Sequence, residues 1–374
     1  MAETAVNPTN ILVFRIGHLG DTIVSLPAFW QIRRSFPAAR MTLLSNADSS
    51  NPDYVSAHAV LPKSGLFDSW ITYPNGLSRI GSLTGHLGLF KTIRKGRFDM
   101  LVYLMTRNRT PKRVRRDISF FRLAGIRDIR GHNYLIDNWL EEHATQKAAA
   151  VISESEFLLK CLDNEGINPQ EPEFCTDLLL DDDEVSFADY WLKTTAGSDL
   201  GDRRFVAIGP GSKWDSKVWS EDRYSAVVKR LIADHDVFPI VFGGPEDRKK
   251  GDRLVEQWSL GANAAGAFTV RQSAAALSKC VLYVGNDTGT MHLAAAVNTP
   301  CVAIFSAIDW VGRWHPFGSG HRVLRKRVEC EGCHSPICKT DRRCLTLIGV
   351  EEVVESCKAV LAKTVKATPV MYSQ

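Results

Sequence analysis

Short runs of apolar residues recur along the chain, and each is followed by turn residues and then by a stretch with helical periodicity. Runs of this length without alternating polar positions are typical of parallel strands covered on both faces. They lie at residues 11–16, 41–44 and 98–104 in the first half, and at 205–208, 237–242, 281–284 and 301–305 in the second. The pattern predicts an α/β protein with two βαβ-type domains.

A polar stretch at residues 194–204 separates the two halves and offers few apolar anchors. Its flexible positions make it the best candidate for a linker. We therefore expect an N-terminal domain at residues 1–193 and a C-terminal domain at 205–374. A final helical segment, at residues 351–364, could pack on either domain, including back on the N-terminal one.

Composition narrows the class of protein. The 374 residues are 44% hydrophobic and 24% charged, as in ordinary globular chains. Residues 1–10 lack the basic and apolar regions of a secretory signal, and about eighteen apolar residues never occur together. The nine cysteines are scattered and odd in number, which argues against complete pairing. We expect a cytoplasmic protein.

The first candidate motif follows the first predicted strand, where Gly17 and Gly20 precede a helical pattern. Ligands of open α/β sheets gather at the carboxyl ends of strands. The glycines permit a tight turn, and Asp21 either caps the helix or faces a cleft. Only two glycines match the dinucleotide pattern G-x-G-x-x-G, so the spacing disfavours a nicotinamide dehydrogenase.

A second glycine turn opens the second half. Ser212, Lys213 and Lys217 place one hydroxyl and two cations beside mobile glycines, a combination that suits a diphosphate. An ordinary solvated loop is the alternative. After a later strand, Glu246 follows two further glycines. A carboxylate at such a position can accept hydrogen bonds from both ribose hydroxyls.

A third turn joins another strand to a helix. Backbone N–H groups at the helix start, together with the hydroxyls of Thr288 and Thr290, form a natural phosphate seat. Asp287 and His292 stand beside this seat. The alternatives are an N-cap for Asp287 and a core position for His292.

Two clusters of one residue type stand out. Cationic residues crowd one stretch at Arg107, Arg109, Lys112, Arg113, Arg115, Arg116, Arg122, Arg127 and Arg130, although the net charge is only +4. The alternative interpretation is a solvated basic face without a binding role. Nucleic-acid binding is disfavoured because no recognised basic-aromatic module is present. Four thiols gather at Cys330, Cys333, Cys338 and Cys344, which makes a structural zinc site a candidate and unliganded thiols the alternative.

Together, four motifs in this order resemble glycosyltransferase family 9, whose known members are ADP-heptose:lipopolysaccharide heptosyltransferases. The resemblance extends over about residues 11–348. The motifs are Arg15-Ile16-Gly17 to Asp21 with Pro27, Lys217 before Trp219, Gly244 to Glu246, and Asp287-Thr288-Gly289 with His292.

The resemblance implies a GT-B fold, in which two Rossmann-like domains face each other across a cleft. It implies an acceptor on the N-terminal domain, a nucleotide sugar on the C-terminal domain, inversion at the anomeric carbon and no need for a divalent metal. Carried over by position, Asp21 becomes the general base and Lys217 binds donor phosphate. Thr288 and Gly289 seat the diphosphate, Glu246 holds the ribose, and Ser212 is an additional phosphate ligand.

The implied reaction moves heptose from ADP-heptose to a lipopolysaccharide core or a related lipid-linked saccharide. Arg107, Arg109 and Arg113 are candidates for holding acidic groups of that acceptor, and the basic stretch could also bring the chain to the anionic inner membrane. Ser220 stands where relatives often carry proline, and no adenine signature is evident near Val270. The alternatives are a family member that uses another nucleotide sugar, an epimerase, and a non-catalytic nucleotide-sugar sensor.

Overall fold

The structure is a computed structural model that describes residues 7–47, 54–74, 79–139, 150–169, 175–197 and 203–364. Part of the expected linker, residues 198–202, lies outside the described residues. The chain divides into two compact units, Met1–Leu179 and Leu180–Gln374. Across the described ranges, no helix combines the length and the apolar character needed to cross a membrane.

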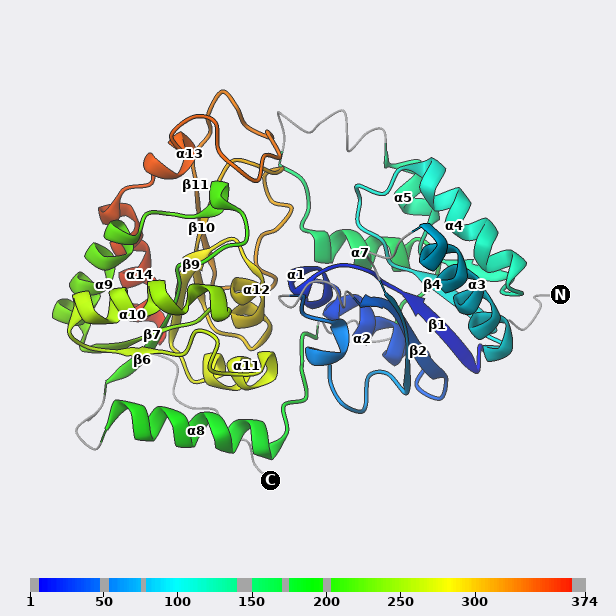
Figure 1. The fold of residues 1–374 in the computed structure, drawn as a ribbon, viewed down its shortest axis with the longest axis horizontal. Coiled ribbons are helices and arrows are strands. Elements are labelled where there is room, and N and C mark those ends of the chain that lie inside the picture. Colours follow the sequence, from blue (N-terminus) through cyan, green and yellow to red (C-terminus); the bar gives the residue numbers. More distant parts are fainter. Residues whose placement is uncertain are drawn as a thin grey trace. The chain divides into compact units, whose positions relative to one another are not determined.

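The first unit is built on a sheet of five parallel strands in the order β3-β2-β1-β4-β5 (Figure 1). Its strands are β1 Asn10–Phe14, β2 Arg40–Ala47, β3 Ser69–Pro74, β4 Met100–Tyr103 and β5 Asp128–Arg130. Its helices are α1 Leu19–Ile23, α2 Leu26–Ser35, the 3₁₀ turn η1 Ala57–Ala59, α3 Arg79–Gly96, α4 Pro111–Leu123, α5 Asn133–Asp137 and α7 Glu154–Asp163.

The second unit has a sheet of six parallel strands in the order β11-β10-β9-β6-β7-β8. Its strands are β6 Arg204–Gly209, β7 Val237–Val241, β8 Ala262–Asn263, β9 Leu282–Asn286, β10 Cys301–Phe305 and β11 Arg322–Arg325. Its helices are α8 Asp182–Ala196, α9 Glu221–His235, α10 Arg248–Trp258, α11 Val270–Ser278, α12 Gly289–Ala296, α13 Arg343–Thr346 and α14 Val350–Thr364, with the 3₁₀ turns η3 Asp215–Lys217 and η4 Pro245–Asp247.

In each sheet the first strand of the chain is a central one, and later strands are added on both of its sides. In the first unit the chain order reverses between β1 and β4, and in the second it reverses between β6 and β9. Such reversals leave a crevice beyond the carboxyl ends of the two central strands, where ligands of doubly wound folds bind. The predicted motifs follow β1, β6 and β9, so the strand order places all three at these reversal points.

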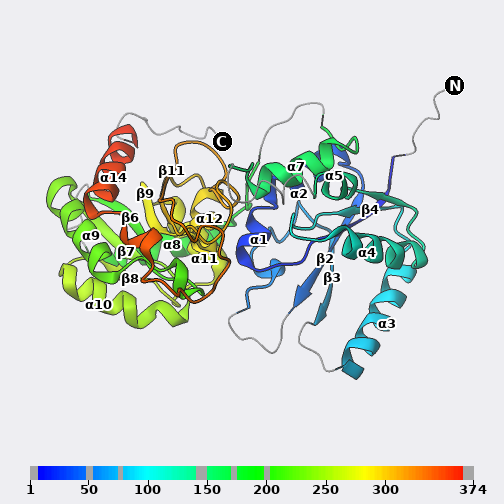
Figure 2. The ribbon, with the colours of Figure 1, turned by 90° about the horizontal axis from the view of Figure 1, so that it is seen from above.

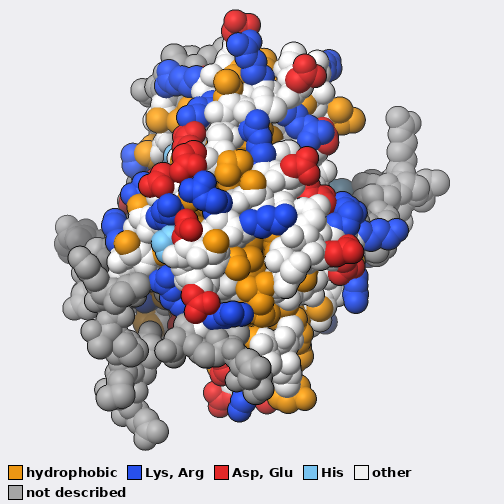
Figure 3. Space-filling model, turned by 90° about the vertical axis from the view of Figure 1, so that its left-hand side faces the viewer, with side chains coloured by type: hydrophobic (Ala, Val, Ile, Leu, Met, Phe, Trp, Pro, Cys, Tyr) orange, Lys and Arg blue, Asp and Glu red, His pale blue; other side chains and the backbone are white. Residues whose placement is uncertain are grey.

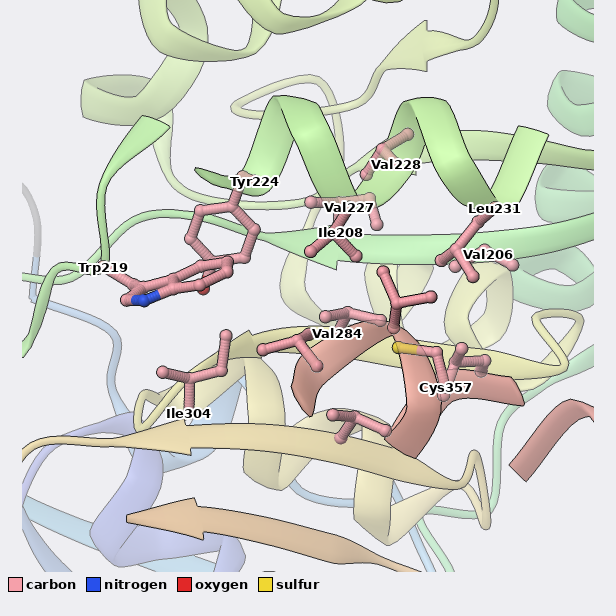
Figure 4. Packing of buried hydrophobic residues seen from close by; sticks show 14 of the residues in the cluster. Val206, Ile208, Trp219, Tyr224, Val227, Val228, Leu231, Val284, Ile304 and Cys357 are labelled. Atoms are coloured by element: carbon pink, nitrogen blue, oxygen red, sulfur yellow. The ribbon is translucent and has the colours of Figure 1, made fainter. Parts of the chain in front are cut away.

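The final helix packs on the second unit, one of the two placements that its sequence left open. Val353, Val354 and Cys357 of α14 are fully buried in one apolar cluster with residues of β6, β9 and α9. Figure 4 shows this cluster, with Cys357 beside Val206 and Val284. The apolar positions of α14 therefore complete the core of the unit that precedes it.

The division between the units falls at residues 179/180, earlier than the expected boundary at 193/194. Helix α8 belongs to the second unit because its side chains pack against α11 and the loop before it. Glu184 forms a buried ion pair with Arg271, with 2.6 Å between Oε1 and Nε. Phe187 and Trp191 contact the ring of Phe268 edge to face. The acidic run that opens α8 serves as its N-terminal cap, since Asp181 accepts from the Glu184 N–H.

Candidate active site

The loops that follow β6 and β9 meet at the reversal point of the second sheet. The two strands are paired, with Gly209 opposite Gly285. The Lys217 ammonium lies 2.6 Å from the Asp287 carboxylate. Both side chains are mostly buried, at 17% and 7% exposure. The fold therefore brings together two predicted site residues that are 70 positions apart in the sequence.

Asp287 does not cap the helix that follows it, so the N-cap alternative for this residue is not what the structure shows. The N-cap position of α12 belongs to Thr288, whose side chain makes no capping hydrogen bond. The first N–H groups of an α-helix have no partner within the helix and carry a partial positive charge. The turn of Thr288, Gly289 and Thr290 thus presents amide donors and two partly exposed hydroxyls next to the Lys217 ammonium.

Asn286 fixes the position of the lysine loop, and sequence reasoning did not single it out. Its side chain is fully buried. The amide nitrogen donates to the carbonyls of Pro210 and Gly211, at 3.0 and 3.2 Å. The amide oxygen accepts from the Trp219 N–H at 3.1 Å and from the Tyr224 hydroxyl at 2.9 Å. Both ends of the loop that carries Lys217 are therefore tied to β9.

The same loop is also held by the cysteine-rich segment. Ser216 is buried, its N–H donates to the carbonyl of Pro336 at 3.1 Å, and its hydroxyl donates to the carbonyl of Ser335 at 2.6 Å. Arg342 pairs with Asp215 at 2.9 Å. Lys217 therefore belongs to a turn that is fixed at the two residues that precede it.

The segment with the four cysteines does not form the candidate zinc site and agrees with the alternative of unliganded thiols. Within the described residues, no group of three or more His, Cys, Asp or Glu side chains is arranged to hold a metal ion. Cys330 and Cys333 are exposed, whereas Cys344 is buried. The Cys338 sulfur accepts from the backbone N–H groups of Thr340 and Arg342, at 3.4 and 3.3 Å. The Cys338 thiol thus helps to hold the backbone of the segment that supports Ser216.

The loop after β7 adds two carboxylates with different surroundings. Glu246 is exposed, which leaves it accessible to a ligand. Asp247 is buried, and desolvation raises the pKa of its carboxyl group. A Cβ atom on Gly211 would lie 2.1 Å from the Asp247 carboxylate, so any larger residue at this position would have to displace that carboxylate. The β7 loop thus packs tightly against the loop that follows β6.

The remaining predicted donor residues differ in their placement. Ser212 is partly exposed, and its hydroxyl accepts from the Trp214 N–H at 3.2 Å. Lys213 is exposed. His292 is 4% exposed and contacts the ring of Trp314, which agrees with the alternative that it is a core histidine.

In the first unit, Asp21 lies in the turn after β1 and is 21% exposed. Its Oδ2 accepts from the His18 N–H at 2.9 Å, so it caps α1. Its Oδ1 lies 3.6 Å from the guanidinium of the buried Arg15. A Cβ on Gly17 would stand 2.3 Å from the Asp21 Cβ, which explains the glycine at that position. Each carboxylate oxygen thus has a neighbour within the turn, and the side chain as a whole stays partly exposed.

The three candidate acceptor arginines do not form one group. Arg107 is fully buried and pairs with the buried Glu154 at 3.1 Å, so its expected contact with an acceptor is contradicted by its position. Arg109 pairs with the Asp117 carboxylate. Arg113 is exposed on α4. Arg107 was misjudged because the sequence does not show that Glu154 lies beside it.

Comparison with known proteins agrees with this geometry. The model of glycosyltransferase family 9 (heptosyltransferase) matches residues 88–342, more than half of the chain. Lipopolysaccharide heptosyltransferase 3 of Escherichia coli K12 is 24% identical over 80% of this chain and 82% of its own length. Lipopolysaccharide heptosyltransferase 2 of the same strain is 29% identical over 36% of this chain, and the match spans only 43% of that relative.

Solved structures share the fold over nearly the whole chain. A glycosyl transferase of family 9 from Veillonella parvula has a TM-score of 0.71 at 18% identity, covering 95% of this chain and 97% of that one. E. coli ADP-heptose LPS heptosyltransferase II has a TM-score of 0.65 at 20% identity, covering 95% and 99%. The expected GT-B fold class, with two Rossmann-like units, is thereby confirmed. The chain belongs to glycosyltransferase family 9, the heptosyltransferase family of glycosyl-transferring enzymes.

Proposed function

We propose that this enzyme transfers heptose from ADP-heptose to a lipopolysaccharide core or a related lipid-linked saccharide, with inversion at the anomeric carbon. The Lys217–Asp287 pair beside the first turn of α12 is the observation that carries the proposal. The named relatives act on lipopolysaccharide, and one neighbouring structure contains ADP-2-deoxy-2-fluoro heptose. In this proposal the first unit holds the acceptor and the second unit holds the donor.

The donor diphosphate would lie against the Lys217 ammonium and the amide groups at the start of α12. Preorganised positive groups stabilise a departing diphosphate because their positions are already fixed when its charge develops. Asp287 keeps the ammonium in place through the 2.6 Å contact, and Asn286 keeps the loop in place. Hydroxyls of Ser212, Thr288 and Thr290 add phosphate contacts.

The remaining donor contact and the chemistry involve two carboxylates. The exposed carboxylate of Glu246 accepts hydrogen bonds from the ribose hydroxyls. Asp21 accepts the proton of the acceptor hydroxyl while that oxygen forms a bond to the anomeric carbon. The bond from this carbon to the donor phosphate breaks, and ADP leaves with the electron pair. One displacement of this kind inverts the anomeric carbon.

Product analysis tests the proposal. The purified enzyme is incubated with ADP-heptose or other nucleotide sugars and an acceptor extract, with and without EDTA, and the products are identified by mass spectrometry. We expect a heptosylated product from ADP-heptose that EDTA does not suppress. Product from a different sugar nucleotide alone would replace the proposed donor. Tight ADP-heptose binding without any product would favour the non-catalytic sensor.

Replacing the base tests the role of Asp21. Asp21→Asn retains an oxygen that can accept from the His18 N–H, so the fold and donor affinity should persist. Loss of general-base assistance should lower kcat about 10²- to 10⁴-fold. Asp128→Asn, a half-exposed carboxylate of the same unit, is the matched control. Turnover of Asp21→Asn equal to that of the control would remove Asp21 from the mechanism.

A further inference from the structure

Tyr283 of β9 lies inside the second unit, close to the phosphate seat formed by Lys217 and the turn of Thr288, Gly289 and Thr290. Its side chain is fully buried. On the face of the molecule drawn in Figure 3, by contrast, charged side chains of both signs lie at the surface. A phenol in the interior carries one polar atom that water does not reach. Its hydroxyl therefore needs a partner within the protein or in a ligand.

The phenol ring points along the sheet toward the carboxyl ends of β6 and β9. A Cβ atom on Gly285 would lie 2.3 Å from the Tyr283 hydroxyl, and one on Gly209 would lie 1.9 Å from it. Gly209 is the last residue of β6 and is paired with Gly285. Helix α12 lies beside β9 in two views at right angles (Figures 1 and 2). The two glycines thus leave room for the hydroxyl where the lysine loop and the turn before α12 leave the sheet.

The hydroxyl makes no hydrogen bond of ordinary geometry within the described part of the chain. A buried hydroxyl without a partner destabilises a fold, and phenylalanine would fill the same space without that cost. Burial, together with the nearby Asp247 and Asp287 carboxylates, raises the pKa of the phenol, whereas the hydroxyl of Thr288 opposes this rise. The phenol therefore keeps its proton and has it available for donation toward Thr288.

We propose that Tyr283 is a positioning residue of the phosphate seat and acts through Thr288. In the donor complex its O–H donates to the Thr288 hydroxyl oxygen, and the Thr288 O–H donates to a diphosphate oxygen. Thr288 makes no capping hydrogen bond to α12 with this hydroxyl. A hydroxyl that accepts one hydrogen bond is a stronger donor in the next, because hydrogen bonds in a chain polarise one another. The inference rests on the proposed function, in which a nucleotide diphosphate lies on this seat.

Removing the phenol oxygen separates a positioning role from a structural one. Tyr283→Phe keeps the ring between the strands and removes a hydroxyl without a protein partner, so stability in urea should equal or exceed that of wild type. Affinity for ADP, measured by calorimetry, should nevertheless fall about 10-fold, as for the loss of one hydrogen bond that serves a charged group. Unchanged ADP affinity would overturn the proposal, and so would a loss of affinity that only accompanies a loss of stability.

A double-mutant cycle tests whether the phenol acts through Thr288. Thr288→Val removes the hydroxyl that stands between the phenol and the diphosphate. In that background, adding Tyr283→Phe should weaken ADP binding by no more than about twofold, because the two changes break the same chain of hydrogen bonds. A further loss of about 10-fold would mean that the two residues act independently, and the relay would be wrong.

Tyr103→Phe in the first unit provides the matched control. The Tyr103 hydroxyl donates to the Asp117 carboxylate at 2.9 Å, so this variant should lose stability and keep wild-type affinity for ADP. An equal loss of ADP affinity in this control would overturn the proposal.

ADP binding involves neither heptose nor acceptor, so these measurements separate the role of Tyr283 from the proposed transfer. Weaker ADP binding by Tyr283→Phe, in an enzyme whose wild type makes no heptosylated product, would support the positioning role and remove the transfer. Heptosyl transfer by wild type, with unchanged ADP affinity in Tyr283→Phe, would do the reverse.

Discussion

Asn286 shows how one buried side chain can organise the loop that carries Lys217. A primary amide has two donors and one acceptor oxygen, and this one has partners at both ends. Its four hydrogen bonds reach Pro210, Gly211, Trp219 and Tyr224. A hydrophobic residue there would leave two carbonyls and one backbone N–H buried without partners. The asparagine therefore sets the position of Lys217 without contacting it.

Asn286→Ala should consequently damage both stability and donor binding. Each buried polar group that loses its partner costs about 1–3 kcal/mol. We expect lower unfolding free energy of the second unit in urea and weaker ADP binding by calorimetry. Tyr224→Phe removes one of the four hydrogen bonds and should show a smaller loss of both. Unchanged ADP affinity in Asn286→Ala would show that the amide is structural only.

At the scale of elements, a buried ion pair joins the loop after β4 to the start of α7. Glu154 accepts from the Arg107 backbone N–H at 3.2 Å and from its Nε at 3.1 Å. The Arg107 guanidinium also donates to the carbonyls of Ile152 and Ser153 and stacks over Phe157, 4.6 Å from the ring centroid. The pair anchors α7 against the carboxyl end of the sheet.

Arg107→Met should destabilise the first unit by about 3–5 kcal/mol, because it leaves the Glu154 carboxylate buried without its cation. Arg107→Met/Glu154→Leu removes both charges and should recover most of this loss in thermal unfolding. The double variant should keep the wild-type KM for the acceptor, since the arginine is fully buried. A large rise in KM with recovered stability would restore Arg107 as an acceptor ligand.

At the scale of the whole molecule, stability should fall in mild acid. His321 is partly buried, its Nδ1 accepts from the Cys301 N–H at 3.1 Å, and desolvation lowers its pKa below 6.5. Below about pH 6.5 the imidazole binds a proton in the unfolded chain, whereas in the folded chain its lowered pKa opposes protonation. The contribution of His321 to the free energy of unfolding is therefore fully present above about pH 6.5 and is lost as the pH falls.

The other ring nitrogen of His321, Nε2, lies 3.0 Å from the Phe317 carbonyl, so His321→Gln can retain both hydrogen bonds without titrating. Urea unfolding between neutral pH and about pH 5 should show a shallower loss of stability in this variant than in wild type. The same pH slope in both proteins would mean that His321 does not contribute. Such an experiment requires no substrate, because it reads only the folding equilibrium.

Fold class and central strands could be predicted because they depend on local composition. Strands β1, β6, β9 and β10 are buried on both faces, so their apolar runs are continuous. The edge strands β3, β5 and β11 escaped prediction because they are partly exposed and carry polar residues, such as the paired Asp128 and Arg130 of β5.

Local sequence was enough to predict the central strands, the glycine turns after them and the motifs of the family, because each depends on neighbours within a few positions. Tertiary structure decided which distant groups meet. It paired Lys217 with Asp287, enclosed Arg107 with Glu154 and placed α14 in the core of the second unit. Among the described residues it also left the four clustered cysteines without an arrangement that could hold a metal ion. The physical reason is that burial and pairing depend on what the folded chain brings alongside a residue, and sequence spacing does not report that.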